Sequence, residues 1–421
     1  MESLSIDTIS LEDIVAHGLC AGCGLCESIA GADRVEMALT SIGRMRPRVK
    51  AALDEAVMGR IRAACPGIAL PGPERCQVAD EGVMHDIWGP IRTMHRGWST
   101  DEGLRFHSAA GGAMTALGCY ILETGKADAI VHVRASAEYP MLTDTLVSRT
   151  TDEVRSGAQS RYGPAAPLRH VMGLLDEDVR FAVLAKPCDV GAIRRLALVD
   201  PRVDAQVPYL ITIFCGGLND LEAPRLMAAW HGVAEEEIAV FRWRGNGWPG
   251  PTRIETRDGR HFDLSYDQAW YTDGMPWREN KQFRCKICPD AIGELGDIAC
   301  PDSWEMREGK PIHEEAPGAN LFVARTERGA ALVAEAAAAG AIHLDPFTIE
   351  ELDLQHFDHV GRKIENPARV RALGALGEPM PRFEGFRAAR MVEIAGPDRD
   401  REAEAGARRR IAEGSHREPL V

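Results

Sequence analysis

The chain has 421 residues, of which 45% are apolar and 27% are charged, values typical of a globular protein. This composition excludes a collagen-like, coiled-coil or wholly disordered chain. The 49 Lys and Arg residues against 63 Asp and Glu residues leave a net charge of −14, whereas nucleic-acid-binding proteins normally carry a basic face. We therefore expect no nucleic-acid partner.

The apolar stretches and the N-terminal residues give no sign of membrane insertion or export. The longest apolar runs, at 210–214 and 330–339, fall short of the roughly 18 residues that a membrane span needs. The first residues are acidic and lack the positive charge and apolar core of a secretory signal. We expect a cytoplasmic protein without a membrane span, in which the eleven cysteines are better explained as metal ligands than as disulfides.

Alternating helices and strands predict an α/β fold (α+β mixed) with a central mixed or parallel sheet. The last residues are highly charged, which is typical of a solvated helix or a mobile tail. The expected strands are 129–134, 181–185 and 210–214, and the expected helices are 111–125, 189–200 and the segment that ends at Trp230. A Pro/Gly-rich linker at 65–76 indicates a division into residues 1–80 as a small N-terminal module, 81–385 as the main domain and 386–421 as the charged tail.

A first cysteine set lies in the N-terminal module, where Cys20, Cys23 and Cys26 follow a C-x2-C-x2-C spacing. Three thiolates at this spacing surround one face of a cubane iron–sulfur cluster, and the glycines between them let the backbone approach the sulfides. Ferredoxins place a fourth cysteine where this chain has Ala30, so Cys65, which precedes a proline, is the expected substitute. The alternative is a structural zinc site, which typically uses two separated C-x2-C pairs.

A second cysteine set is assembled from loops further along the chain. Cys188 and Cys215 each follow an expected strand, and the carboxyl ends of parallel strands are where open α/β sheets bind ligands. Cys285 and Cys288 form a C-x2-C-P turn. These four residues suit a second 4Fe–4S cluster, and the alternative is a pair of buried cysteines beside a zinc knuckle.

Three cysteines and two histidines fall outside these sets. Cys119 lies in the middle of an expected helix and is assigned to the core, whereas Cys76 and Cys300 compete as ligands. His356 and His359 lack the glutamate of an H-E-x-x-H zinc motif, so we expect them in the core or on the surface.

Glycine-rich and basic segments suggest further contacts. HSAAGG at 107–112 opens a helix, so its N–H groups suit the phosphates of a nucleotide-type cofactor such as FAD, although an ordinary helix cap explains it equally. GNGWPG at 245–250 cannot open a helix because it contains proline, and we interpret it as a loop with Trp243 and Trp248 available for stacking. A basic run is either a solvated strand face or a docking site for an acidic ferredoxin; it comprises Arg44, Arg46, Arg48 and Lys50.

Together these segments resemble the beta subunit of the deazaflavin-coenzyme (factor 420) hydrogenases and dehydrogenases, a family that includes ferredoxin-dependent chlorophyll-pathway reductases. The similarity runs from Cys20 to about Arg328. The chain departs from the family at Ala109 and Ala110, where two serines are common, and at Cys300 and Ala185, where glycine is common. The matching segments are CAGCGLC at 20–26, CPG at 65–67, HSAAGGAMTAL at 107–117, SRYGPAAPL at 160–168, AKPCD at 185–189, FCGG at 214–217, RGNGWPG at 244–250, RCKIC at 284–288 and GDIACPDSW at 296–304.

The resemblance implies a flavin domain with FAD beside an iron–sulfur cluster, and a small N-terminal ferredoxin-like module with an added cluster. It implies that the flavin-proximal cluster is held by Cys188, Cys215, Cys285 and Cys288. It also implies FAD or substrate contacts from His107, Ser108, Gly111, Gly112, Arg161, Tyr162, Lys186 and Arg244.

We therefore expect an iron–sulfur flavoprotein oxidoreductase. Reduced ferredoxin or another low-potential donor would pass electrons through two 4Fe–4S clusters to FAD and on to a small organic substrate as a hydride. Lys186 or Arg161 would act catalytically by stabilising negative charge on the reduced flavin. The alternatives are an electron-transfer subunit that exchanges hydride with a deazaflavin coenzyme in a hydrogenase or dehydrogenase complex, and a zinc-binding scaffold. The substrate, and the choice between a homo-oligomer and a complex subunit, stay open.

Overall fold

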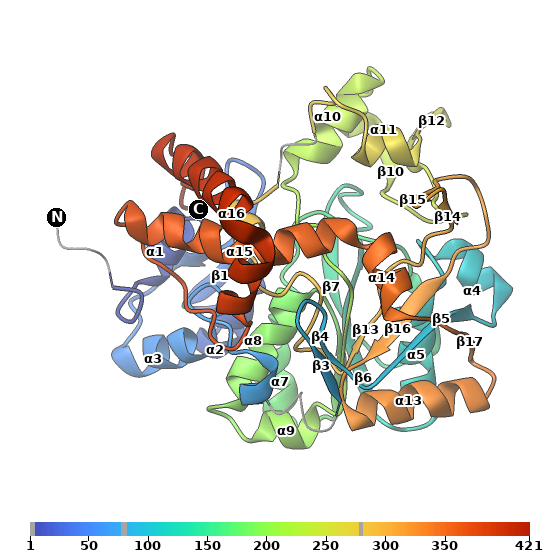
Figure 1. Ribbon diagram of the computed structural model, residues 1–421, viewed down its shortest axis with the longest axis horizontal. Coiled ribbons are helices and arrows are strands. Elements are labelled where there is room, and N and C mark those ends of the chain that lie inside the picture. Colours follow the sequence, from blue (N-terminus) through green and yellow to red (C-terminus); the bar gives the residue numbers. More distant parts are fainter. Residues whose placement is uncertain (1–4, 77–81, 278–280) are drawn as a thin grey trace.

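A computed structural model describes residues 5–76, 82–277 and 281–421 around one eight-stranded mixed sheet (Figure 1). The strand order is β17-β5-β16-β13-β9-β8-β6-β7. Four adjacent strands, β13, β9, β8 and β6, pair in parallel, and the strands on either side of them pair antiparallel. The strands are β5 (Thr93–Ser99), β6 (Ala129–Ala135), β7 (Thr143–Ser148), β8 (Phe181–Leu184), β9 (Leu210–Thr212), β13 (Ile298–Ala299), β16 (Asn320–Ala324) and β17 (Ile342–Pro346). The predicted mixed α/β class is thus confirmed.

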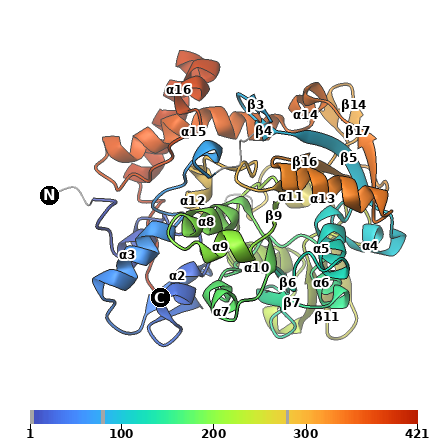
Figure 2. The same ribbon diagram turned by 90° about the horizontal axis from the view of Figure 1, so that it is seen from below.

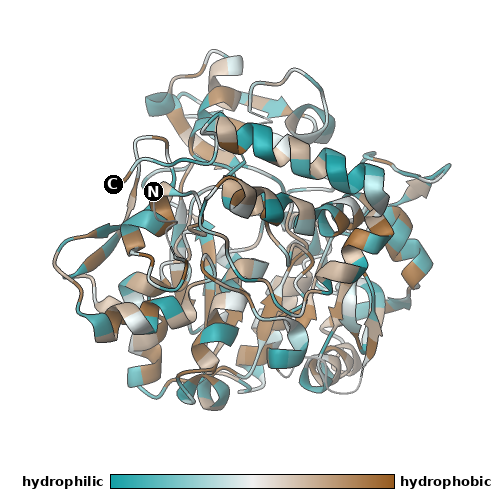
Figure 3. Cartoon of the chain, turned by 60° about the vertical axis from the view of Figure 1, so that its left-hand side comes forward, coloured by the Kyte–Doolittle hydropathy of each residue, from teal (hydrophilic) through white to brown (hydrophobic). Residues whose placement is uncertain are grey.

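Both faces of this sheet are covered, because alternate residues of the central strands enter two different cores. Phe181 and Val183 pack in one core with α7 and α8, whereas Ala182 and Leu184 pack in a second core with α5 and α13. Such alternation is what a strand buried on both faces requires. Hydrophobic residues, brown in Figure 3, gather on the inner elements, and hydrophilic residues lie along the outer helices. The covering helices are α5 (Ala113–Glu123), α6 (Thr151–Ser156), α7 (Val171–Asp176), α8 (Pro187–Ala197), α9 (Arg202–Gln206) and α13 (Glu327–Ala338).

The N-terminal segment packs against the first core rather than standing apart from it. Both ribbon views place it at one end of the molecule beside α8 (Figures 1 and 2). Its apolar residues, including Ile14 and Leu70, share one buried cluster with Val190 and Ile193 of α8. The expected boundary at residues 80 and 81 lies outside the described residues. The elements are α1 (Leu11–Ala16), α2 (Leu25–Ala30), β1 (Val35–Leu39), β2 (Met45–Val49), α3 (Glu55–Ala64) and the 3-10 helix η1 (Pro73–Cys76).

The C-terminal segment is helical, with a break at Gly396, and its end returns to the N-terminal segment. Helices α14 (Ile349–Gln355), α15 (Phe357–Ala375) and α16 (Ala388–Ala412) follow the sheet, and α15 and α16 pack side by side (Figure 2). After α16 the chain passes beside α1, where His416 and Glu418 are buried. Of the two expected forms, a solvated helix and a mobile tail, the structure shows a helix with an anchored end.

The remaining elements form a small lobe and several connections. The lobe is an antiparallel sheet with its own core, packed with α10 and α11 (Figure 1). No helix in the described ranges has the length and apolar character to cross a membrane. The elements are β3 (Val83–His85), β4 (Gly89–Ile91), α4 (Glu102–His107), α10 (Glu222–Trp230), η2 (Glu235–Glu237), β10 (Ile238–Arg242), β11 (Thr252–Thr256), β12 (His261–Leu264), α11 (Tyr266–Trp270), α12 (Phe283–Lys286), β14 (Met306–Arg307) and β15 (Lys310–Pro311).

Asp297 joins the sheet to helices on both of its faces. Its fully buried carboxylate accepts hydrogen bonds from Arg194 of α8 (3.0 Å), Arg328 of α13 (2.7 Å) and the Leu210 N–H of β9 (2.8 Å). Burial alone would raise the pKa of Asp297, but Arg194 and Arg328 outweigh burial and lower it below its ordinary value. The charged form is therefore favoured in the folded protein.

We predict that Asp297→Ala lowers the free energy of unfolding by about 3–5 kcal/mol at pH 7, because it leaves two cations without their buried partner. Since the folded pKa is lowered, this stabilisation is complete above the unfolded value of about 4 and is lost as the pH falls through the folded value. Denaturant unfolding followed by circular dichroism measures it. Asp128→Ala, at an exposed pair with Arg180, is the control and should cost under about 1 kcal/mol. An Asp297→Ala effect of equal size at pH 7 and pH 3 would contradict the assignment.

Candidate functional site

The first cysteine set surrounds a single cavity. Cys20, Cys23, Cys26 and Cys65 all line a space of about 390 Å³ bounded by residues of α1, α2 and α3. Two of the thiols are buried and two are half-buried, and none of the cysteines in the described ranges forms a disulfide. Cys65, which we expected to replace the missing fourth ligand, therefore lines the same cavity as the other three cysteines.

Backbone geometry explains why glycines separate these cysteines. Gly22 and Gly24 have φ values of +72° and +84°, in the left-handed region that favours glycine. A side chain at Gly22 would lie 2.9 Å from the carbonyl oxygen of Met45. The N–H of Gly22 also donates to the sulfur of Cys20 at 3.4 Å, so the loop both curls around the cavity and directs a donor at a thiol.

The second cysteine set surrounds another cavity, of about 440 Å³, lined by Cys188, Cys215, Cys285 and Cys288. The first two follow β8 and β9, which pair in parallel, so both lie at the carboxyl edge of the sheet as predicted. Cys285 lies in the short helix α12, and its sulfur accepts a hydrogen bond from the Leu218 N–H at 3.3 Å.

Burial makes both cavities unfavourable places for an uncompensated thiolate. It raises the pKa of Cys20 to about 11, against the lowering effect of Arg46, and the pKa of Cys215 to about 11. It raises the pKa of Cys23 and of Cys188 well above the ordinary value. A cation that binds four thiolates supplies the missing compensation, and a coordinating thiol is deprotonated by the metal itself.

The three remaining cysteines lie away from these cavities. Cys300 and Cys119 belong to the core beneath α5, and Cys76 belongs to the core beside α8. Neither cavity has any of the three among its lining residues. Their positions in the structure therefore separate Cys300 and Cys76 from the two cysteine sets. Their positions in the sequence did not allow this separation.

The two cavities adjoin, and a buried cation lies between them. Ala21 lines both cavities. The fully buried guanidinium of Arg46 donates to Glu418 (2.6 Å) and to Gln282 (2.8 Å). Its charge acts on the thiols of both Cys20 and Cys285, so one side chain links the two sets electrostatically.

The basic run around Arg46 is therefore not a free docking surface. Arg44 pairs with Glu418 (2.9 Å), and its side chain is only 12% exposed. Arg48 and Lys50 are exposed, but both pair with Glu36. The hypothesis of a basic ferredoxin-docking strip is wrong for Arg44 and Arg46, because their charges are neutralised by a carboxylate from the far end of the chain.

Lys186 belongs to the second cysteine cavity, which it lines together with Cys188. Its ammonium lies 2.6 Å and 2.7 Å from the two carboxylate oxygens of Asp189, whose side chain is buried. The charge of Lys186 acts on Cys188 and also on Cys23 of the first set. From α15, Arg362 donates to the carbonyl oxygens of Cys215 (3.0 Å) and Cys285 (3.1 Å) and holds those two loops together.

Arg244 connects four of the segments that were singled out in the sequence. Its buried guanidinium donates to the carbonyl oxygens of Ala109 (2.8 Å) and Pro249 (3.1 Å), to the Tyr162 hydroxyl (3.3 Å) and to Asp302 (2.6 Å). The HSAAGG loop and the GNGWPG loop are thus fixed to one another. Because each guanidinium nitrogen of Arg244 already donates to one of these groups, the role of this side chain is to fix the positions of the loops.

The other expected flavin contacts divide into two groups. Arg161 donates to the carbonyl oxygens of Pro140, Leu142 and Phe241, and burial lowers its pKa to about 10, so it remains charged at neutral pH. His107 is exposed and contacts Asn246 at 3.0 Å. The hydroxyl of Ser108 is buried and has no hydrogen-bond partner among the described residues.

Gly111 and Gly112 open α5 as expected. Gly112 has a φ of +76° and lies at the helix N-cap, where no side chain caps the helix. The next N–H, of Ala113, donates to the Asn320 side chain at 3.2 Å. The tryptophans expected to be available for stacking are instead buried: Trp243 lies in the core of the small lobe and Trp248 packs on Trp304. His356 is buried and His359 is half-buried, and neither lines a cysteine cavity.

Comparisons with known proteins cover the sheet and the second cysteine set. Two sequence models for the beta subunit of coenzyme F420 hydrogenase/dehydrogenase match, that of its N-terminal part over residues 94–172 and that of its C-terminal part over 178–350. The chain is 25% identical over 252 residues to the F420-dependent formate dehydrogenase subunit beta of Methanocaldococcus jannaschii, a match that covers 58% of this chain and 60% of that protein. It is 22% identical over 317 residues to the coenzyme F420 hydrogenase subunit beta of Methanothermobacter thermautotrophicus, covering 70% of this chain and 99% of that one.

A solved structure shares the fold. A chain of the F420-reducing [NiFe] hydrogenase complex from Methanosarcina barkeri aligns with a TM-score of 0.56 at 19% identity, covering 71% of this chain and 98% of that one. The two family models together match more than half of the chain. The chain belongs to the coenzyme F420 hydrogenase/dehydrogenase beta-subunit family. It spans about three fifths of the length of the Methanocaldococcus protein, and its first cysteine set precedes both matched segments.

We predict that Lys186→Met lowers the free energy of unfolding by about 3–5 kcal/mol, because it leaves the buried carboxylate of Asp189 unpaired. The double replacement Lys186→Met with Asp189→Leu should recover most of this loss, since it removes both charges. Anaerobic denaturant unfolding measures both variants. A double variant as unstable as the single one would show that the ion pair is not what Lys186 supplies to this cavity.

Proposed function

We propose that the chain is an electron-transfer beta subunit that exchanges hydride with coenzyme F420 on behalf of a hydrogenase-type or formate dehydrogenase-type partner. The observation that carries the proposal is the convergence of eight cysteines on two adjoining buried cavities, within the fold of this family. The named relatives are subunits of enzymes that act on formate or hydrogen with F420, which supports both the coenzyme and the kind of partner.

Each cavity fits a 4Fe–4S cluster by its donor set. Four thiols converge, backbone N–H groups point at sulfur, and burial leaves the thiolates in need of a cation. We assign Cys20, Cys23, Cys26 and Cys65 to a cluster in a ferredoxin-like segment of residues 1–80. We assign Cys188, Cys215, Cys285 and Cys288 to a cluster in the main domain, residues 81–385.

The loops that Arg244 joins fit a flavin, for which we propose FAD. The hydroxyl of Ser108 and the indole N–H of Trp248 are buried there without hydrogen-bond partners among the described residues, and buried polar groups in native proteins normally have one. His107 and the opening of α5 at Gly111 and Gly112 complete the assigned contacts. When bound, iron–sulfur clusters carry single electrons and a flavin couples two of them to hydride transfer.

The chain's own residues then have separate roles. Arg46 and Lys186 each contribute a buried ion pair beside the cysteine cavities, with Glu418 and Asp189 as their respective carboxylate partners. Arg244 and Arg161 hold the loops of the flavin region in place by donating to backbone carbonyls.

One observation favours a second function, in which a soluble one-electron carrier feeds the chain. The first cysteine set lies in residues that precede the family match, so it adds a point at which electrons can enter the matched fold. A ferredoxin or another low-potential donor is the class of partner that suits such a point. In that case the chain reduces a small organic substrate itself.

The test is the cofactor content and turnover of the anaerobically purified chain. We predict about eight iron and eight labile sulfide atoms per chain, with FAD released on denaturation. Cys20→Ser and Cys285→Ser should each lose about half of the iron, and Cys300→Ala, the matched control, should lose none. Chemically reduced protein should pass hydride to coenzyme F420, seen as bleaching of its absorbance.

Three results would count against the proposal. Protein without labile sulfide, or a Cys300→Ala variant that loses iron like Cys285→Ser, would refute the assignment of the cysteines. Intact clusters that reduce no F420, but turn over another substrate with reduced ferredoxin, would favour the second function.

A further inference from the structure

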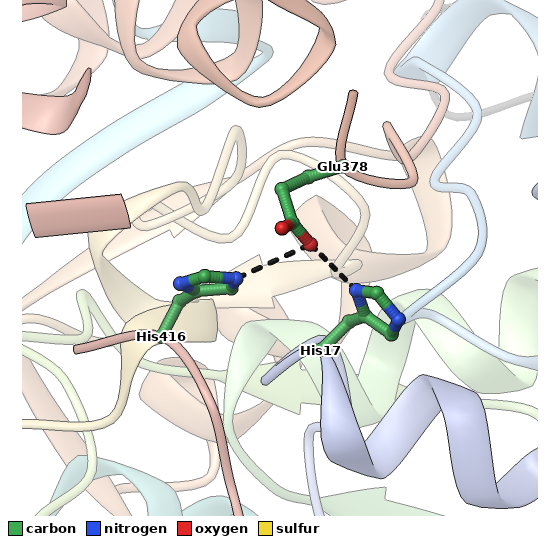
Figure 4. Close-up of side chains that lie close together, drawn as sticks. All are labelled: His17, Glu378 and His416. Carbon is green, nitrogen blue, oxygen red and sulfur yellow. Dashed lines mark hydrogen bonds and ion pairs between the residues drawn. The ribbon is translucent and has the colours of Figure 1, made fainter. Parts of the chain in front are cut away.

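Two histidines and a glutamate converge outside the cysteine cavities (Figure 4). His17 ends α1, Glu378 follows α15, and His416 lies in the segment after α16. One atom from each lies within 4.8 Å of the other two. The Oε2 of Glu378 is 2.6 Å from Nδ1 of His17 and 3.2 Å from Nε2 of His416.

His416 is held in place without a hydrogen bond. Its side chain is 2% exposed, and neither ring nitrogen has a hydrogen-bond partner among the described residues, because the approach to Glu378 lacks hydrogen-bond geometry. The ring packs on Phe283 at 5.5 Å, and the backbone of His416 lies against Gly18, where any side chain would clash. A buried imidazole that is fixed, makes no hydrogen bond and lies 3.2 Å from a carboxylate oxygen is placed to bind a cation together with that carboxylate.

The donor set indicates which cation. Two imidazoles and one carboxylate with an open fourth position are a ligand set typical of zinc. Tetrahedral ligands at about 2.0–2.1 Å from zinc lie roughly 3.3 Å from one another. Here the two contacts of Glu378 are 2.6 Å and 3.2 Å, and all three ligand atoms lie within 4.8 Å of one another. We propose that His17, Glu378 and His416 bind one zinc ion, with water as the fourth ligand.

Arg417 occupies the place of that cation in this structure. It donates from Nη2 to Oε1 of Glu378 (2.6 Å), and its Nη1 lies 3.0 Å from Nδ1 of His17. Its side chain is 47% exposed and can therefore turn toward solvent. Zinc binding would displace Arg417 from the ring of His17 and leave Oε1 of Glu378 as its acceptor.

The site would fasten the C-terminal segment to the N-terminal one. The N–H of Glu418 donates to the carbonyl oxygen of Ala16 at 3.2 Å, and the Glu418 carboxylate holds Arg46 between the two cysteine cavities. A zinc ion next to this contact would fix Glu418, and through it the position of the buried guanidinium.

The test is zinc binding to the intact, anaerobically purified protein, measured by competition with a chromophoric chelator. Wild type should bind one zinc ion more tightly than the variants His17→Ala and His416→Ala. Loss of an outer-shell partner weakens metal binding roughly 10–100-fold. Loss of a direct ligand in either variant should weaken zinc binding by more than this. His343→Ala removes an exposed histidine paired with Asp345 and should bind like wild type. Arg417→Ala removes the competing cation and should bind at least as tightly.

Zinc K-edge absorption identifies the ligands. We expect a first shell of nitrogen and oxygen at about 2.0–2.1 Å, with the scattering pattern of imidazole. A sulfur shell near 2.3 Å would place the zinc in a cysteine cavity and overturn the proposal. The absence of zinc binding would overturn the proposal too. So would equal zinc binding by wild type and the variants His17→Ala and His416→Ala, or weaker zinc binding by Arg417→Ala. Each of these results would show that the residues around Glu378 form only an ion-pair cluster.

Discussion

The gathering of eight thiols around two adjoining cavities is the constraint on which the rest of the structure depends. A thiolate is the metal-binding form of cysteine, and burial alone disfavours it, as the raised pKa of Cys20 and Cys188 shows. A fold that gathers four thiols around each of two cavities therefore favours their thiolate form only when cations compensate the charge. Metal binding and folding are coupled in such sites.

Fixed charges are arranged around this constraint by residues from distant parts of the chain. Arg46 comes from the N-terminal hairpin, its partner Glu418 from the last residues, and Gln282 from the loop that leads into α12. Lys186 and Asp189 add a second buried pair at the start of α8, and Arg362 fastens the Cys215 and Cys285 loops from α15. The C-terminal helices thus act as part of the site.

Local signals in the sequence predicted the elements that form through local interactions. The apolar runs gave β6, β8 and β9, and glycine at 112 marked the start of α5. The grouping of the cysteines also followed from spacing and from the rule that ligands gather at the carboxyl edge of parallel strands. The short strand β13 was missed, because two residues carry no detectable alternation.

The long-range partners could not be predicted in the same way. Arg46 reads as part of a basic surface run because its acidic partner lies 372 positions away along the chain. Trp243 and Trp248 were predicted to be available for stacking. The neighbouring sequence does not reveal that Trp243 is buried in the core of the small lobe or that Trp248 packs on the ring of Trp304. Cys300 competed as a ligand until the strand order placed it in a core. In each case the missing information was which segments meet in space.

The central claim is that two redox centres lie side by side and share the loop at Ala21. It is tested most directly by electron paramagnetic resonance of the fully reduced, anaerobically purified protein. We predict signals from two reduced clusters that broaden and split one another through magnetic coupling, which disappears when only one cluster is reduced. A spectrum of two clusters that sums without interaction, or of one cluster alone, would contradict the arrangement.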